Sequence, residues 1–86
     1  MTYRPADGVL AEDVDGNVVL ITAAGDELLD LNPTGSAVWR ALGAGADLDA
    51  IVATVRDAFP DAPADALATD VSTFLAELVE AGLVVG

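Results

Sequence analysis

One stretch of this sequence decides how the chain folds: ELLDLNPTGSAVWRALG, residues 27–43. Its first five residues predict a short strand, which ends at Asn32-Pro33 because proline cannot donate to a strand ladder. Asn32 is also a good N-cap with proline at the first helical position, so a helix begins there. Apolar residues recur on one face of that helix as far as Gly43, which ends it. The chain therefore changes from strand to helix within this stretch.

The residues before this stretch predict a hairpin. Two short β-favouring runs cover residues 8–13 and 17–22. The Asp15-Gly16 step between them is typical of a tight turn. A second turn, at residues 24–26, leads into the third strand, residues 27–31. The first third of the chain thus predicts a three-stranded antiparallel meander.

The residues after this stretch predict two more helices. Asp47 can cap a helix whose apolar residues recur at helical spacing as far as Phe59, and Pro60 ends it. The last helix opens near residues 61–63 and stops at Gly82. Its apolar face carries Leu67, Val71, Phe74, Leu75 and Leu78. We expect residues 83–85 to pack back against the domain as a short tail.

These elements predict an α+β fold in which a three-stranded antiparallel sheet is followed by three helices. A chain of 86 residues has room for one compact domain, so we expect a single winged-helix-like domain over residues 1–86. Trp39 and Phe74 each lie on the apolar stripe of a helix. Core packing is therefore the expected role of Trp39 and at least part of the role of Phe74.

The charge of the chain restricts its partners. Three basic residues against 15 acidic ones give a net charge of −12. Nucleic-acid binding depends on Lys and Arg that neutralise phosphates, so we expect no nucleic-acid partner and a neutral or basic one instead. No apolar run approaches the roughly 20 residues that cross a bilayer, and the N-terminus does not resemble a secretory signal. We therefore expect no membrane partner and a cytoplasmic location.

The chain contains no cysteine and no histidine, which excludes disulfides, thiolate nucleophiles, the usual zinc sites and the usual general base. Residues 13–17 have the aspartates of a calcium-binding loop, but the glycine comes too early and the terminal Glu is missing. Asp47 and Asp49 fit helix capping and the helix dipole. We expect no catalytic residue, no metal site and no cofactor.

Several segments in order carry a family resemblance. They are Leu29–Trp39, a glycine-containing link, a helix ending in Phe59-Pro60, and the pattern Asp70-Val71-x-x-Phe74-Leu75-x-x-Leu78-x-x-x-Gly82-Leu83. Together they resemble the PqqD-like family over nearly the whole chain. Within that family, the Leu-Asn-Pro-Thr-Gly stretch and the free-standing size are similar to the B1 proteins of lasso-peptide biosynthesis.

The resemblance implies a non-catalytic element that recognises the leader of a ribosomally synthesised precursor peptide. The leader would add as a strand beside the third strand and lie in a groove bordered by the third helix. The implied leader-binding residues are Glu27, Leu28, Leu29, Asp30, Leu31, Asp70, Phe74, Glu77 and Leu78. The implied partners are a B2-type leader peptidase and an ATP-dependent macrolactam cyclase. Many relatives have aromatic or basic residues where this chain has Glu27-Leu28-Leu29-Asp30.

Other interpretations fit parts of the same sequence. A PqqD-type chaperone in quinone-cofactor biosynthesis would have the same fold, and so would a winged-helix regulatory domain, although the charge opposes DNA binding. An edge strand can hold an extended peptide through its backbone while nearby pockets select side chains. The third strand could also be a protected edge, at which Glu27 and Asp30 discourage aggregation.

Overall fold

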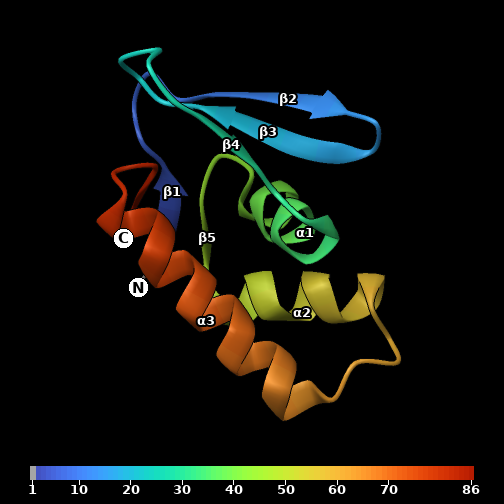
Figure 1. Ribbon diagram of the computed structural model, residues 1–86. Coiled ribbons are helices and arrows are strands. Elements are labelled where there is room, and N and C mark those ends of the chain that lie inside the picture. Colours follow the sequence, from blue (N-terminus) through green and yellow to red (C-terminus); the bar gives the residue numbers. More distant parts are fainter. Residues whose placement is uncertain (1) are drawn as a thin grey trace.

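Three helices and two small antiparallel sheets form the protein in a computed structural model, which describes residues 2–86 (Figure 1). In chain order the elements are β1 (Thr2–Pro5), β2 (Leu10–Val14), β3 (Asn17–Ile21), β4 (Leu28–Asp30), α1 (Pro33–Leu42), β5 (Ala46–Asp47), α2 (Leu48–Ala58), α3 (Ala64–Glu80) and β6 (Val84–Val85). The predicted α+β class is confirmed, whereas the likeness to a winged helix stays a prediction. No helix within residues 2–86 is both long enough and apolar enough to cross a membrane.

The larger sheet has the strand order β2-β3-β4, as the predicted meander requires. Val14 pairs with Asn17 across a two-residue turn in which Asp15 has a φ of 53° and Gly16 a φ of 87°. Positive φ at both central positions is the type I′ arrangement, whose twist suits a hairpin. The predicted strands are correct to within two residues at each end.

A second sheet, which the sequence did not predict, joins the two ends of the chain. Strand β1 pairs with both β5 and β6, so the first residues of the chain meet its last residues in a second sheet. The Ala6 N–H also donates to the Leu83 carbonyl at 3.0 Å. Strands β5 and β6 have two residues each, which is too short to show a period of two in the sequence. The expected packing of the tail is confirmed, since Leu83 and Val84 are buried.

The helix ends lie close to their predicted positions. The Asn32 side chain accepts from the Gly35 N–H at 2.7 Å and starts α1, and the Asp47 side chain accepts from the Ala50 N–H at 2.8 Å and starts α2. Each cap satisfies a backbone donor that has no partner within its helix. Helix α3 follows Pro63 and has no side-chain cap.

One hydrophobic core lies between the larger sheet and the helices, which cover a single face of that sheet (Figure 1). Strand β3 contributes Val18 and Leu20, and Trp39 packs against the core while partly buried, as predicted. The buried core residues are Val18, Leu20, Leu31, Val38, Leu42, Ile51, Val55, Leu67, Val71, Leu75, Leu78, Leu83 and Val84. The opposite face of the sheet is left without helices.

The buried Ser36 hydroxyl joins α1 to the end of the β3–β4 pair. It accepts from the Val18 N–H at 2.8 Å and lies 3.3 Å from the Leu31 carbonyl, to which it can donate. The hydroxyl thus bridges a backbone group of β3 and the backbone carbonyl that follows β4. This contact fixes where β4 ends and α1 begins.

Candidate functional site

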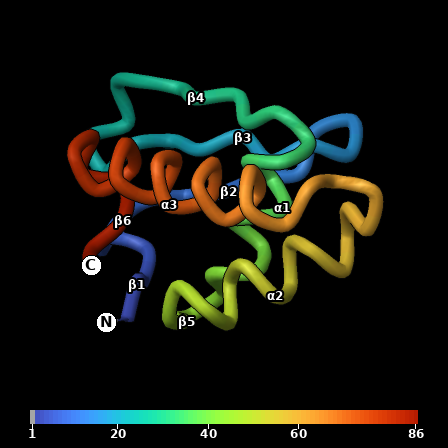
Figure 2. Tube along the Cα trace, turned by 90° about the horizontal axis from the view of Figure 1, so that it is seen from below, coloured from blue at the N-terminus to red at the C-terminus, as the bar shows by residue number. Residues whose placement is uncertain are grey.

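Strand β4 is an edge of the larger sheet, because within residues 2–86 it pairs with β3 alone. Figure 2 shows β4 along the outer side of the sheet, with α3 running across the sheet's helical face. An edge strand presents N–H and C=O groups that can pair with another strand. The direction in which these groups point decides which residues of β4 could form hydrogen bonds with an added strand.

Two hydrogen bonds at the ends of the β3–β4 pair fix the direction of every backbone group between them. The Leu31 N–H donates to the Val18 carbonyl at 2.9 Å, and the Thr22 N–H donates to the Glu27 carbonyl at 3.2 Å. Opposed residues in an antiparallel pair alternate between bonded and non-bonded. Both observed bonds belong to bonded pairs, so the pair midway between them is also bonded.

That middle pair is Leu20 with Leu29. Leu29 therefore directs its N–H and C=O groups toward β3, where the fold uses them. Leu28 and Asp30 belong to the non-bonded pairs, so their backbone groups point away from β3. The free edge of β4 thus offers two N–H donors and two C=O acceptors, from Leu28 and Asp30.

The side chains of β4 alternate between the two faces of the sheet. Leu29 lies opposite the fully buried Leu20 and so faces the helices, yet it is 40% exposed. Leu31 faces the same way and is 4% exposed. Leu28 faces the side without helices and is 71% exposed. The exposure of Leu29 shows that the helices leave part of their own side of β4 uncovered.

A hollow of about 320 Å³ lies in this uncovered region, between β4 and the C-terminal half of α3. Its walls are mostly apolar, and Glu77 of α3 contributes a carboxylate, whereas Asp30 shares the strand face of Leu28. The walls consist of Leu29, Asp30, Leu31, Asn32, Phe74, Glu77, Leu78 and Ala81. An extended peptide paired with β4 would place every second side chain over this hollow.

A second hollow of about 220 Å³ adjoins the first, because both are lined by Asn32 and Phe74. It lies between the first turns of α1 and the middle of α3. Its walls are Asn32, Thr34, Gly35, Val38, Asp70, Val71 and Phe74. We call the two hollows together the α3 groove.

The Phe74 ring stands at the centre of the α3 groove, where it packs against the core and remains partly exposed. Its position depends on Gly35, since a Cβ at that residue would lie 3.0 Å from Phe74 Cζ and 3.1 Å from Asn32 Oδ1. Real Cβ atoms rarely come so close to another atom. Glycine at this position lets α1 approach the ring closely.

The α3 groove contains seven of the nine residues singled out in the sequence. Leu29, Asp30, Leu31, Phe74, Glu77 and Leu78 line its first hollow, and Asp70 lines its second. Glu27 and Leu28 line neither. Glu27 precedes β4 and uses its carbonyl in the fold, whereas Leu28 can reach a peptide only through its backbone or from the opposite face. A role in binding stays a prediction for all nine.

Sequence reasoning missed several residues of the groove wall. Ala81 could have been found, because it follows Phe74 and Glu77 at helical spacing, directly after the last residue of α3. Asn32 was identified only as a cap, and its place between the two hollows depends on how α1 packs against α3. Thr34 and Gly35 belong to the Leu-Asn-Pro-Thr-Gly stretch of the family resemblance, but their place in the groove wall was not predicted, since their contact with α3 is a tertiary one.

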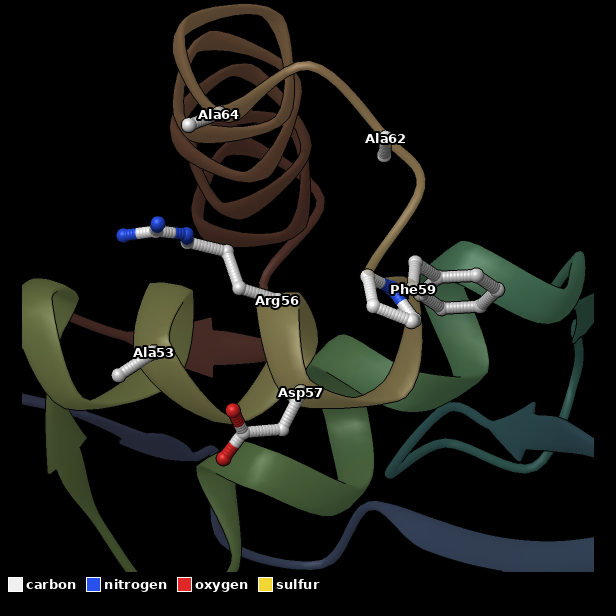
Figure 3. A pocket seen from close by; sticks show the side chains of 7 residues that line it. Ala53, Arg56, Asp57, Phe59, Ala62 and Ala64 are labelled. Atoms are coloured by element: carbon white, nitrogen blue, oxygen red, sulfur yellow. The ribbon is translucent and has the colours of Figure 1, made fainter.

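A larger hollow than either of those in the α3 groove lies elsewhere, between the end of α2 and the start of α3 (Figure 3). It has a volume of about 440 Å³ and includes Arg56, which points away from the Phe59 ring. None of its residues belongs to β4, so it has no free strand edge beside it. It is therefore a weaker candidate for binding an extended peptide than the smaller α3 groove.

The α3 groove has few groups that could perform chemistry. The sequence has neither histidine nor cysteine, and Thr34 is the one hydroxyl residue lining either hollow of the groove. Within residues 2–86, no group of three or more carboxylates could hold a metal ion. What the groove offers is a free backbone edge, an apolar floor and carboxylates at its rim.

Comparisons with known proteins identify the family and the fold of this chain. The profile of the family described as Coenzyme PQQ synthesis protein D (PqqD) matches residues 17–84. The chain belongs to the PqqD family. A solved structure described as TbiB1 in complex with the TbiA(beta) leader peptide superposes with a TM-score of 0.84 at 25% sequence identity, over 96% of this chain and 95% of that one. No curated protein matches the sequence.

The PqqD match includes both walls of the groove. It begins at the first residue of β3 and ends within β6, so it contains β4 and α3 entirely. Strands β1 and β2 lie outside it. The part of this PqqD-family chain that matches the profile is therefore the part that builds the free edge and the α3 groove.

Proposed function

We propose that this PqqD-family protein binds the leader segment of a ribosomally synthesised precursor peptide, of the lasso class, and does no chemistry on it. The observation that carries the proposal is the free edge of β4 beside the α3 groove. A similar solved structure is described as a complex with a leader peptide, which supports the same class of ligand.

Strand addition to β4 accounts for binding only together with the groove. The free edge offers four backbone hydrogen bonds, and each is worth about 0.5 to 1.5 kcal/mol net. Association costs at least about 4 kcal/mol in lost translation and rotation. Backbone pairing therefore roughly offsets this cost, and side chains that enter the α3 groove must supply the rest of the affinity. Burying one leucine-sized side chain contributes about 1.5 to 3 kcal/mol.

The division of the binding free energy between backbone pairing and buried side chains also explains how a small module can be specific. Backbone groups pair with any extended sequence except at proline, so the edge of β4 sets the path of the leader. The floor formed by Leu29, Phe74 and Leu78 then selects the side chains that point inward. Residues beyond the bound segment stay free for a leader peptidase and an ATP-dependent cyclase, to which the module would deliver the precursor.

The absence of chemistry is tested by mixing the purified protein with a full precursor and recording mass spectra over time. Fluorescence anisotropy with a labelled synthetic leader tests binding in the same preparation. We expect binding with no change in precursor mass, because no nucleophile-base pair lies in the groove. Cleavage or modification by this chain alone would contradict the proposal.

A second candidate function follows from the description of the matched family, which names coenzyme PQQ synthesis. A chaperone for a quinone-cofactor precursor would use the same edge and groove. The two candidates differ in the genes nearby: a short reading frame beside peptidase and cyclase genes favours the lasso class. Quinone-cofactor genes would favour the second candidate.

A further inference from the structure

The α3 groove has an apolar centre between two carboxylates of the same helix. Asp70 and Glu77 lie seven residues apart, which places them on one face of α3 two turns from each other. Phe74 lies between them in sequence and belongs to both hollows. At a rise of about 1.5 Å per residue, the two carboxylates stand roughly 6 Å and 4.5 Å along the helix from Phe74. No lysine or arginine lines either hollow.

The carboxylates of the groove have no basic partner inside the protein. Within residues 2–86, Arg4 pairs with Asp7 and Arg40 pairs with Asp13, and neither Asp70 nor Glu77 takes part in an ion pair. The remaining cation, Arg56, lies at the other hollow, near the end of α2. Since none of the three arginines lines this groove, a bound peptide can supply the lysine or arginine partner that Asp70 and Glu77 lack within residues 2–86.

The spacing of the carboxylates fits the repeat of an extended peptide. Side chains on one face of a strand recur about every 6.8 Å, which is twice the rise per residue. The axes of strand β4 and α3 lie along nearly the same direction in both views (Figures 1 and 2), so a peptide paired with β4 would run along the helix. A residue anchored over Phe74 would then have its neighbours two positions away within roughly 1 to 2.5 Å of the heights of Asp70 and Glu77. Lysine or arginine side chains at those two positions are long enough to bring their charge to a carboxylate at the rim.

We propose that the leader this protein binds carries an apolar anchor flanked, two residues away on one or both sides, by lysine or arginine. The proposal rests on the proposed function, because it assumes an extended peptide paired with β4. The carboxylates do not make the site, which is formed by the free edge and the apolar floor. They determine which peptides the site accepts, since Asp70 and Glu77 attract basic flanking residues and repel acidic ones.

A selection from displayed random short peptides tests this preference and does not require the natural precursor. The full chain is compared with the double variant Asp70→Asn/Glu77→Gln. The matched control is Asp65→Asn/Glu80→Gln, which removes the same charge from exposed positions of α3 outside the groove. We expect basic residues to be enriched two positions from an apolar residue with the full chain and the control, and not with the double variant.

A selected peptide, resynthesised with a fluorophore, then gives the size of the effect. Each carboxylate removed from the groove should weaken binding about two- to fivefold, as for partly exposed ion pairs. Raising the salt concentration from about 0.05 M to about 0.5 M should weaken binding to the full chain more than to the double variant, because salt screens exposed charges. The control variant should bind as the full chain does.

The outcomes separate this proposal from the one on which it rests. Peptides that bind without any preference for basic residues, with equal affinity for the full chain and the double variant, would overturn the charge preference and leave strand addition intact. If no extended peptide is selected, or if the selected peptides bind a Leu28→Pro variant as tightly as a Leu28→Ala variant, strand addition fails and the charge preference fails with it.

Discussion

Proline substitutions at the two leucines of β4 should have opposite effects, because the fold uses the N–H of only one of them. The Leu29 N–H faces Leu20 in β3, whereas the Leu28 N–H faces the free edge. Proline removes the N–H and holds φ near −65°. Leu29→Pro should therefore damage folding, and Leu28→Pro should mainly damage leader binding.

The sizes of these effects follow from the surroundings of each leucine. Leu29→Pro leaves the carbonyl of the fully buried Leu20 without its partner, which costs about 1 to 3 kcal/mol of unfolding free energy. In a domain of this size, each kcal/mol lowers Tm by roughly 4 to 8 °C. Leu28 is 71% exposed, so its substitution should change the unfolding free energy by less than about 0.5 kcal/mol. The unpaired carbonyl left on the leader should cost about 1 to 3 kcal/mol, or roughly 5- to 150-fold in Kd.

Circular dichroism melts would report folding, and fluorescence anisotropy with a labelled leader would report affinity. Leu28→Ala and Leu29→Ala serve as controls for the lost side chains. If both proline variants stay as stable as their alanine controls and bind the leader as tightly, the peptide does not pair with β4. If Leu28→Pro unfolds the protein while Leu29→Pro does not, the assignment of the outward-facing groups is wrong.

Three further substitutions test the groove and the contacts that position it. Phe74→Ala should lower the unfolding free energy by about 1 to 3 kcal/mol, less than for a fully buried ring, and should weaken leader binding roughly 30-fold or more. Denaturant melts and anisotropy measure the two effects, and unchanged values of both would contradict the placement of the ring. Ser36→Ala should cost about 1 to 3 kcal/mol of stability, because the Val18 N–H loses its acceptor, and a loss below about 0.5 kcal/mol in the same melts would refute that role. Gly35→Ala should displace the Phe74 ring and weaken leader binding in the anisotropy assay with little change in Tm, whereas unaltered affinity would show that the ring need not move.

The helices and the larger sheet could be predicted because their signals are local. Asn32 and Asp47 accept from the backbone three residues ahead, as their positions before apolar helical patterns indicate. The Asp15-Gly16 turn places the hairpin in register by itself. These signals depend on residues within one or two turns of each other, so the sequence contains them in full.

The second sheet could not be predicted, because its strands are short and distant in sequence. Strand β1 meets β5 more than 40 residues later and β6 about 80 residues later. Neither partner is long enough to show an alternating pattern. Asp47 is a clear helix cap, but a cap does not indicate that Ala46 and Asp47 also pair with β1.

The walls of the candidate site could be predicted better than its geometry. Helical spacing predicts one stripe of residues on α3, and that stripe lines the groove. It consists of Asp70, Phe74, Glu77 and Leu78. The outward direction of the Leu28 backbone depends on the register of β3 against β4, which no local pattern sets. The alternation of a strand predicts that the backbone groups of Leu28 and Leu29 point in opposite directions, but only the register shows that those of Leu28 point outward.

Hydrogen exchange of the β4 amides tests the central claim, that the leader pairs with the free edge of β4, most directly. In the ¹⁵N-labelled protein alone, the Leu28 and Asp30 amides should exchange quickly, because they face away from β3, while the Leu29 amide should be protected by its bond to β3. Saturating leader should slow exchange at Leu28, Asp30 or both, with little further change at Leu29. If the leader binds and neither amide gains protection, the leader does not add to this edge and the proposed binding mode is wrong.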